Sequence, residues 1–182
     1  MSLNILILYG SLEGQTEKIS LRIADIMRSK GHQVTVQSGE KLPADLSIDN
    51  YDAAIIGGPI HMGKYPEYIK IFVTKHRDWL NTVPSAFFTV CMGVHSQRAE
   101  SRAEAMRYGE NFIAQTGWKP KVTGTFSGAV KYTQYNIFTR LIMKLIARRE
   151  GGSTDTTRDH EYTDWESVEK LARNFMVEIA KP

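Results

Sequence analysis

The chain has 182 residues, 42% of them hydrophobic and 24% charged, which predicts one globular domain with a full core. Its net charge of +3 is too small to indicate a nucleic-acid partner, and its single cysteine, Cys91, excludes an internal disulfide and fits a reducing cytoplasm. No apolar run approaches the about 20 residues that span a bilayer, and no signal peptide is expected.

The first third of the chain predicts a strand, a helix and a second strand. Asn4–Tyr9 is nearly continuously apolar, as in a strand covered on both faces. Thr16–Lys30 repeats apolar residues at helical spacing and is followed by Gly31, a residue type common just after helices. His32–Ser38 alternates between polar and apolar residues like a strand.

The middle of the chain continues this alternation of strands and helices. We expect strands at Ala53–Gly57, Ser85–Met92 and Lys121–Ser127, and helices at Tyr68–Leu80 and Ala99–Thr116. Five apolar strands alternating with helices predict an α/β fold, a doubly wound parallel sheet with helices on both faces.

The last helix has a clear predicted start and a long segment before it. The letters TDWE place Thr163 as the N-cap and Glu166 three residues later, the pattern of a capping box. Between the fifth strand and this helix lies the segment 128–163, about 36 residues against the usual 2–6 for such connections. We therefore expect this insertion to have a function.

The loop GSLEGQT, Gly10–Thr16, connects the first strand to the first helix and indicates an anion site. In an open parallel sheet, ligands bind beyond the carboxyl ends of the strands. Backbone N–H groups at the start of the helix and the hydroxyls of Ser11 and Thr16 suit a phosphate, and Gly14 permits close approach. The alternative is an ordinary helix start capped by serine and threonine.

Two further loops leave strands at the same predicted edge. In GGPIHMGKYP, Gly57–Pro66, the side chains of Ile60, His61, Met62 and Tyr65 could wall a flat ring, although a plain strand-to-helix turn would also explain the loop. In CMGVHSQRAE, Cys91–Glu100, Gly93 permits close approach of a ligand. Together the three loops predict a site for an aromatic phosphate ester.

The insertion contains an amphipathic basic helix, expected from about Asn136. One half of its helical wheel is apolar and the other carries Arg140 and Lys144. The simplest interpretation is that the apolar half packs on the domain. That half consists of Ile137, Phe138, Leu141, Ile142, Leu145 and Ile146.

Other chemistries find no support in the sequence. The histidines show no metal-ligand spacing, no nucleophile elbow is present, and Cys91 has no nearby cysteine for disulfide chemistry. We therefore predict no metal site.

The motifs GSLEGQT and GGPIHMGKY resemble those of flavodoxins, which bind flavin mononucleotide (FMN). More closely, the chain is similar along nearly its whole length to the bacterial menaquinone-dependent protoporphyrinogen IX dehydrogenases, on the pieces EGQT, KYPEYIKIFVTKH, PSAFFTV, GAVKYTQYNIFTRLIMKLIARREGGSTDT and YTDWE. This resemblance implies a flavodoxin-like sheet of order 2-1-3-4-5 with the insertion inside a single domain, and it assigns the FMN contacts. The implied cofactor-binding residues are Ser11, Leu12, Glu13, Gly14, Gln15, Thr16, Gly58, Pro59, Ile60, His61, Met62, Gly63, Met92, Gly93 and Val94.

A carboxylate in a phosphate loop requires an explanation. Flavodoxins usually have a hydroxyl residue where Glu13 stands, whereas the dehydrogenase family tolerates an acid there. We expect the Glu13 side chain to point to solvent, where water and salt screen its charge.

The resemblance implies a flavin-centred oxidation of protoporphyrinogen IX in heme biosynthesis, with menaquinone as acceptor, and this flavin-centred chemistry requires no catalytic side chain. The insertion would receive the porphyrin propionates through Lys131, Tyr132, Tyr135, Arg140 and Lys144, or lie on the inner face of the cytoplasmic membrane. The sequence is also compatible with a homo-oligomer. The alternatives are an electron carrier of the flavodoxin type, against which the basic insertion and positive charge argue, and an FMN-dependent quinone reductase with another donor.

Overall fold

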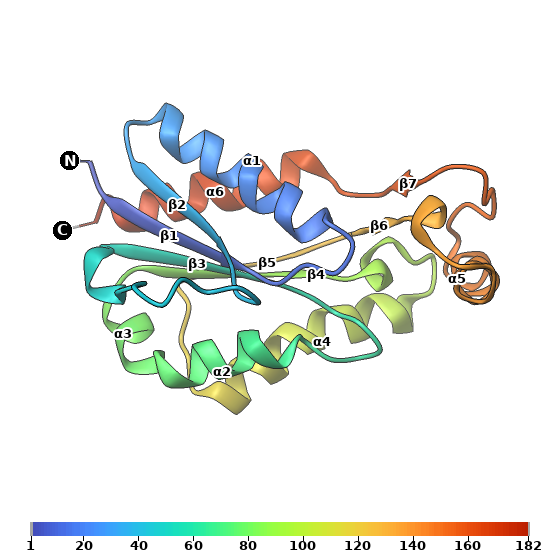
Figure 1. Ribbon diagram of the computed structural model, residues 1–182, viewed down its shortest axis with the longest axis horizontal. Helices are drawn as coiled ribbons and strands as arrows, with labels where there is room; N and C mark the ends of the chain where they lie inside the picture. The colour runs from blue at the N-terminus through green and yellow to red at the C-terminus, as the bar shows by residue number, and fades with distance from the viewer. Residues whose placement is uncertain (1, 182) are drawn as a thin grey trace.

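A computed structural model describes residues 2–181 and has a five-stranded parallel sheet at its centre (Figure 1). The strands are β1 (Asn4–Tyr9), β2 (Gln33–Ser38), β3 (Ala53–Pro59), β4 (Ser85–Val90) and β5 (Val122–Phe126). Their order, β2-β1-β3-β4-β5, confirms the expected flavodoxin-like topology. All four pairings are parallel; Ile7, for example, lies between Val36 and Ile55.

Helices cover both faces of this sheet (Figure 1). On one face lie α1 (Gln15–Ser29) and α6 (Trp165–Ile179), and on the other lie α2 (Glu67–Lys75), α3 (Arg77–Thr82) and α4 (Ala99–Thr116). The short 3₁₀ turns η1 (Ile48–Asn50) and η2 (Met92–His95) lead into β3 and α4.

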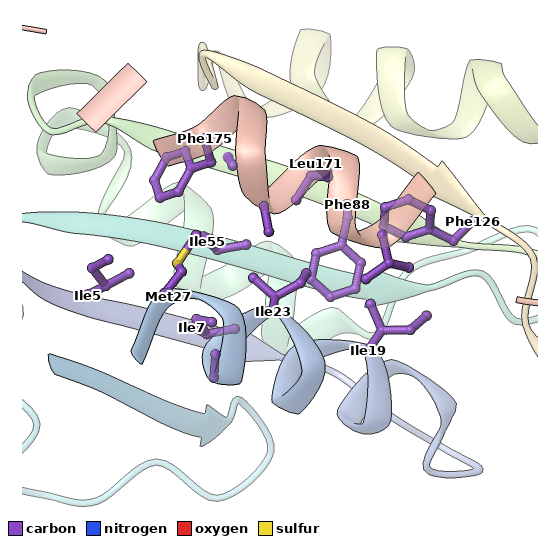
Figure 2. Packing of buried hydrophobic residues seen from close by; sticks show 14 of the residues in the cluster. Ile5, Ile7, Ile19, Ile23, Met27, Ile55, Phe88, Phe126, Leu171 and Phe175 are labelled. Carbon is purple, nitrogen blue, oxygen red and sulfur yellow. The ribbon is translucent and has the colours of Figure 1, made fainter. Parts of the chain in front are cut away.

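The larger apolar cluster fills the space between the sheet and the α1–α6 layer (Figure 2). Ile23 of α1, Ile55 of β3, Phe88 of β4 and Phe175 of α6 meet there, and each is essentially fully buried. Because the central strands are covered on both faces, they require the nearly continuous apolar runs seen in the sequence.

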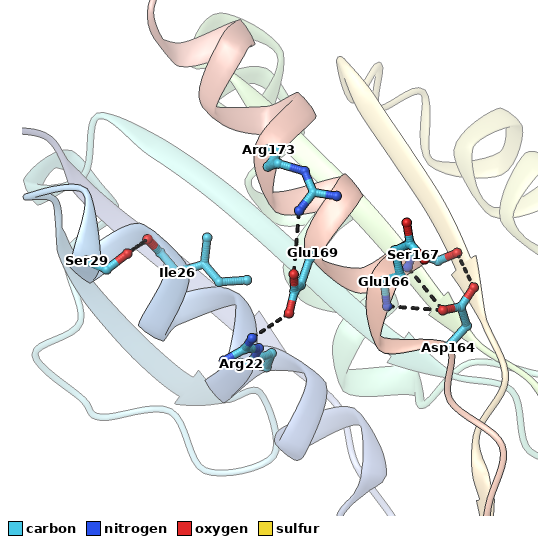
Figure 3. A network of polar contacts seen from close by, with 8 residues as sticks. All are labelled: Arg22, Ile26, Ser29, Asp164, Glu166, Ser167, Glu169 and Arg173. Atoms are coloured by element: carbon cyan, nitrogen blue, oxygen red, sulfur yellow. Dashed lines mark hydrogen bonds and ion pairs between the residues drawn. The ribbon is translucent and has the colours of Figure 1, made fainter.

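Polar contacts join the same two helices at the surface (Figure 3). Arg22 of α1 forms an ion pair with Glu169 of α6, which also pairs with Arg173 one turn further on. The pair lies at the outer edge of the α1–α6 contact and is partly exposed, so it orients the helices more than it stabilises them.

Two sequence predictions about helices were wrong. The helix expected at Tyr68–Leu80 is broken at His76 into α2 and α3, and Phe72 of α2 and Leu80 of α3 are both buried. The N-cap of α6 is Asp164 and not Thr163: the Asp164 carboxylate accepts hydrogen bonds from the backbone N–H groups of Glu166 and Ser167 (Figure 3). A carboxylate can accept both bonds at once, and it also complements the positive end of the helix dipole.

The insertion, residues 128–163, extends beyond the carboxyl ends of the strands (Figure 1). Its two ends pair as a short antiparallel ribbon of β6 (Ala129–Val130) and β7 (His160–Glu161). Between them lie η3 (Tyr132–Gln134) and α5 (Ile137–Glu150), whose N-cap Asn136 accepts a hydrogen bond from the Thr139 N–H.

Candidate functional site

A pocket lies where the carboxyl ends of β1, β3 and β4 meet the insertion. All three loops singled out in the sequence contribute to its walls, and α5 closes one side. Its lining residues are Ser11, Leu12, Glu13, Gln15, Thr16, Pro59, Ile60, His61, Val90, Met92, Gly128, Ala129, Thr139 and Met143.

The first loop presents an uncapped helix start to this pocket. Gly14 precedes α1 with a φ of 85°, a conformation that side chains disfavour, and within residues 2–181 no side chain caps the helix. Ser11 instead accepts a hydrogen bond from the Gly14 N–H at 3.0 Å, which shapes the loop itself. The interpretation as an ordinary capped helix start is therefore wrong, and the first-turn N–H groups can bind an anion.

The Glu13 side chain does not point to solvent as expected. Its carboxylate accepts a hydrogen bond of 2.6 Å from the Tyr135 hydroxyl of the insertion, and that hydroxyl in turn accepts one of 3.2 Å from the Lys131 N–H. Burial, followed by the bond to Glu13, raises the pKa of Tyr135, so its hydroxyl stays a donor. The carboxylate is thus held against the insertion.

Only part of the second loop reaches the pocket. Pro59, Ile60 and His61 line it, and the Ile60 N–H is bonded to the Val90 carbonyl at 2.8 Å. Met62 and Gly63 form the tip of a tight turn with positive φ values, and Met62 is 89% exposed.

Gly58 and Tyr65 face away from the pocket, into the opposite layer. Tyr65 packs against Phe87 and Phe112 and bonds to Thr89 at 2.7 Å. A Cβ on Gly58 would stand 2.7 Å from the Tyr65 ring, so the glycine makes room for Tyr65 and not for a ligand ring.

The third loop contributes one residue, Met92. Gly93 packs against α4, where a Cβ would meet the Ser101 carbonyl oxygen at 3.0 Å, and Val94 is not among the lining residues. Burial raises the pKa of the adjacent Cys91 thiol, so it remains protonated and is a poor nucleophile.

The insertion residues expected to hold a substrate mostly hold the insertion together. Lys131 pairs with Asp159, the Tyr132 hydroxyl donates to the Ser153 carbonyl, and Arg140 donates to the carbonyls of Tyr132 and Tyr135. Lys144 is exposed and forms no ion pair within residues 2–181. None of these four, nor Tyr135, lines the pocket.

Sequence reasoning missed the α5 side of the pocket. Thr139 and Met143 line it from positions four residues apart, on the helix face opposite the apolar half. The spacing of four residues is present in the sequence, but the apolar residues on the other face form the stronger helical pattern. Among residues 2–181 no group of three metal-ligating side chains comes together.

Comparisons with known proteins agree with this geometry. Residues 6–157 match the flavodoxin domain family. The protoporphyrinogen IX dehydrogenase [quinone] of Escherichia coli (strain K12) is 33% identical over 178 residues, covering 97% of both chains, and that of Leishmania major is 29% identical, covering 93% of this chain and 73% of its own.

Solved structures with the same fold include two flavodoxins. One is a short-chain flavodoxin associated with a bacterial microcompartment (TM-score 0.57, 12% identity, covering 98% of this chain and 99% of its own). The other is a flavodoxin from the domain Archaea (TM-score 0.53, 16% identity, covering 97% and 96%). With the full-length similarity to the dehydrogenases, these matches show that the chain belongs to the flavodoxin-like family of protoporphyrinogen IX dehydrogenases [quinone].

Proposed function

We propose that this chain is an FMN-dependent enzyme that oxidises protoporphyrinogen IX and passes the electrons to menaquinone. The observation that carries the proposal is the joining of the phosphate loop and α5 in one pocket. A flavodoxin core alone would serve an electron carrier, whereas a wall supplied by the insertion makes a more enclosed site for a large organic substrate.

The pocket residues fit FMN. The first-turn N–H groups of α1 and the hydroxyls of Ser11 and Thr16 would hold the phosphate. Ile60, Met92 and Met143 give apolar walls that would exclude water from a ring. When bound, FMN supplies the electron-accepting centre, and the chain's own task is binding and orientation.

The exposed side of α5 supports a membrane contact. The apolar half does not pack on the domain as first expected: its side chains are exposed, from 42% for Ile146 to 81% for Phe138. The helix packs instead through Met143 and Ala147, and Lys144, Arg148 and Arg149 are exposed on the same helix. Such a face suits the anionic membrane surface in which a lipid-soluble quinone resides.

No helix among residues 2–181 has the length and apolar character needed to cross a bilayer. The contact we propose is peripheral, with α5 lying in the plane of the surface. Arg140 is not part of it, because its guanidinium is bonded to backbone carbonyls.

An anaerobic assay tests the reaction. The FMN-loaded protein, mixed with protoporphyrinogen IX and a menaquinone analogue, should produce porphyrin fluorescence faster than the spontaneous rate. If the flavin exchanges electrons only with small redox proteins and no porphyrin forms, the chain is a carrier. Titration with riboflavin, which lacks the phosphate, should give much weaker binding than FMN.

Flotation with anionic vesicles tests the contact. Leu141→Glu should reduce vesicle binding strongly, because it places a charge on the exposed apolar face of α5. Val177→Glu is the matched control, since Val177 is similarly exposed on α6 at 62%. Equal binding by both variants would contradict the membrane contact, and a loss of self-association on Leu141→Glu would assign the face to a second copy of the chain.

A further inference from the structure

We infer that Tyr135 is a positioning residue for the cofactor: by holding the Glu13 carboxylate, it keeps the phosphate loop free to bind an anion. The inference rests on the proposed binding of FMN at this loop and goes beyond it, because it assigns a role to a contact between parts of the chain that lie 122 residues apart.

The first step is electrostatic. Glu13 lines the pocket within a loop whose N–H groups would receive a phosphate, so a freely moving carboxylate would repel that phosphate or accept the same N–H groups itself. The 2.6 Å bond from Tyr135 commits the carboxylate to the insertion. The loop then keeps its backbone donors for the ligand.

The second step concerns how firmly Tyr135 is held. Its hydroxyl accepts from the Lys131 N–H, and its carbonyl accepts from the Arg140 guanidinium at 3.1 Å. The same guanidinium bonds the Tyr132 carbonyl, so one arginine fixes the whole turn from which Tyr135 projects. Arg140 thus acts through Tyr135 and not through a substrate.

Neighbouring contacts also join the start of α1 to the insertion. The Gln15 side chain donates to the Thr163 hydroxyl at 2.8 Å, and Thr163 donates onward to the Ser127 carbonyl. Lys18 pairs with Glu161 of β7 at 2.5 Å. These bonds link the start of α1 to the far end of the insertion, so an FMN-bound loop should also stabilise the insertion.

A double-mutant cycle on FMN affinity tests the inference, with flavin fluorescence quenching as the readout. Y135F should weaken FMN binding about tenfold, because it frees a partly buried carboxylate beside the phosphate site. In the E13Q background the same Y135F change should alter the affinity by no more than about threefold, because no charge remains to be held.

The matched control is Y132F. It removes a tyrosine hydroxyl that bonds the Ser153 carbonyl inside the insertion and does not touch the loop, so FMN affinity should not change. Hydrogen exchange gives a second readout: FMN should slow exchange in residues 131–136 of the wild-type protein and much less in Y135F.

The outcomes separate this inference from the proposed function. If the wild-type protein does not bind FMN, the proposed function fails. If it binds FMN but Y135F binds equally well, or Y135F weakens binding to the same extent with and without E13Q, the role of Tyr135 is overturned. Weakening by Y132F equal to that by Y135F would also overturn it, since general loosening of the insertion would then be the cause.

Discussion

The helices α5 and α6 are alike in length and in amphipathic pattern but place their apolar residues in opposite surroundings. In α6, Val168, Leu171 and Phe175 are at most 3% exposed. Figure 2 shows Leu171 and Phe175 pointing into the core that α6 shares with α1. In α5, Ile137 and Phe138 are about four-fifths exposed. A helical period identifies an apolar face, whereas the rest of the fold decides what covers it.

The two helices are also held by different forces. The buried face of α6 belongs to a cluster drawn from six elements of the core, so α6 is fixed by apolar packing. The insertion has only a small cluster around Val130, Tyr132 and Ala147, and it depends heavily on polar contacts such as those of Arg140 and Asp159. The insertion should therefore respond to mutation differently from the core.

The largest effect should come from the same truncation made on each helix. Phe175→Ala removes a fully buried ring and should lower the free energy of unfolding by about 3–5 kcal/mol, which lowers the Tm by roughly 10 °C. Phe138→Ala removes an exposed ring and should change stability by no more than about 0.5 kcal/mol. Thermal unfolding measures both, and a comparable loss in Phe138→Ala would mean that the α5 face is covered in solution.

A smaller effect should come from the two helix caps. Asp164→Ala removes the N-cap of α6 and should cost about 1 kcal/mol, a fall in Tm of about 2–4 °C. Asn136→Ala removes the equivalent cap of α5 and should leave the Tm within about 1 °C, while proteolysis within the insertion becomes faster. Equal falls in Tm would show that the insertion and the core unfold together as one cooperative unit.

Much of the core was predictable because its signals are local. Continuous apolar runs such as Asn4–Tyr9 indicate buried parallel strands, and Ala99–Thr116 was bounded correctly as a helix by its period and the following Gly117. The break at His76 was missed because the apolar period continues across it. Thr163 and Asp164 are both good capping residues, so spacing alone could not choose between them.

The site was predictable only as far as the loops themselves. The candidate phosphate loop, Gly10–Thr16, could be located from the sequence, but its contact with the insertion joins Glu13 to a tyrosine more than a hundred residues away. No local pattern encodes such a pair. For the same reason nothing in the sequence indicates that Arg140 is occupied within the insertion. Its partners are backbone carbonyls, which every residue has, so no residue type identifies them.

The smallest effect should come from Asp159, a polar anchor of the insertion. Its carboxylate accepts from the Thr133 N–H at 3.0 Å and from the Thr133 hydroxyl at 2.8 Å, and it pairs with Lys131. The bond from the Thr133 N–H, followed by the other contacts, holds the pKa of Asp159 below its ordinary value. The stabilisation is therefore fully present above the unfolded-state pKa of about 3.9, and it is lost as the pH falls through the lower folded-state pKa.

Asp159→Asn should reproduce the acid state at neutral pH. We expect hydrogen exchange at the Thr133 amide to become several-fold faster while the Tm changes by less than about 1 °C, because the group is close to solvent and outside the core. Asp155→Asn is the control: the Asp155 carboxylate bonds Thr157 within its own turn and should leave the Thr133 amide unaffected. If Asp159→Asn instead lowered the Tm by several degrees, the insertion would unfold together with the core. The helices α5 and α6 would then differ only in whether their apolar faces are covered.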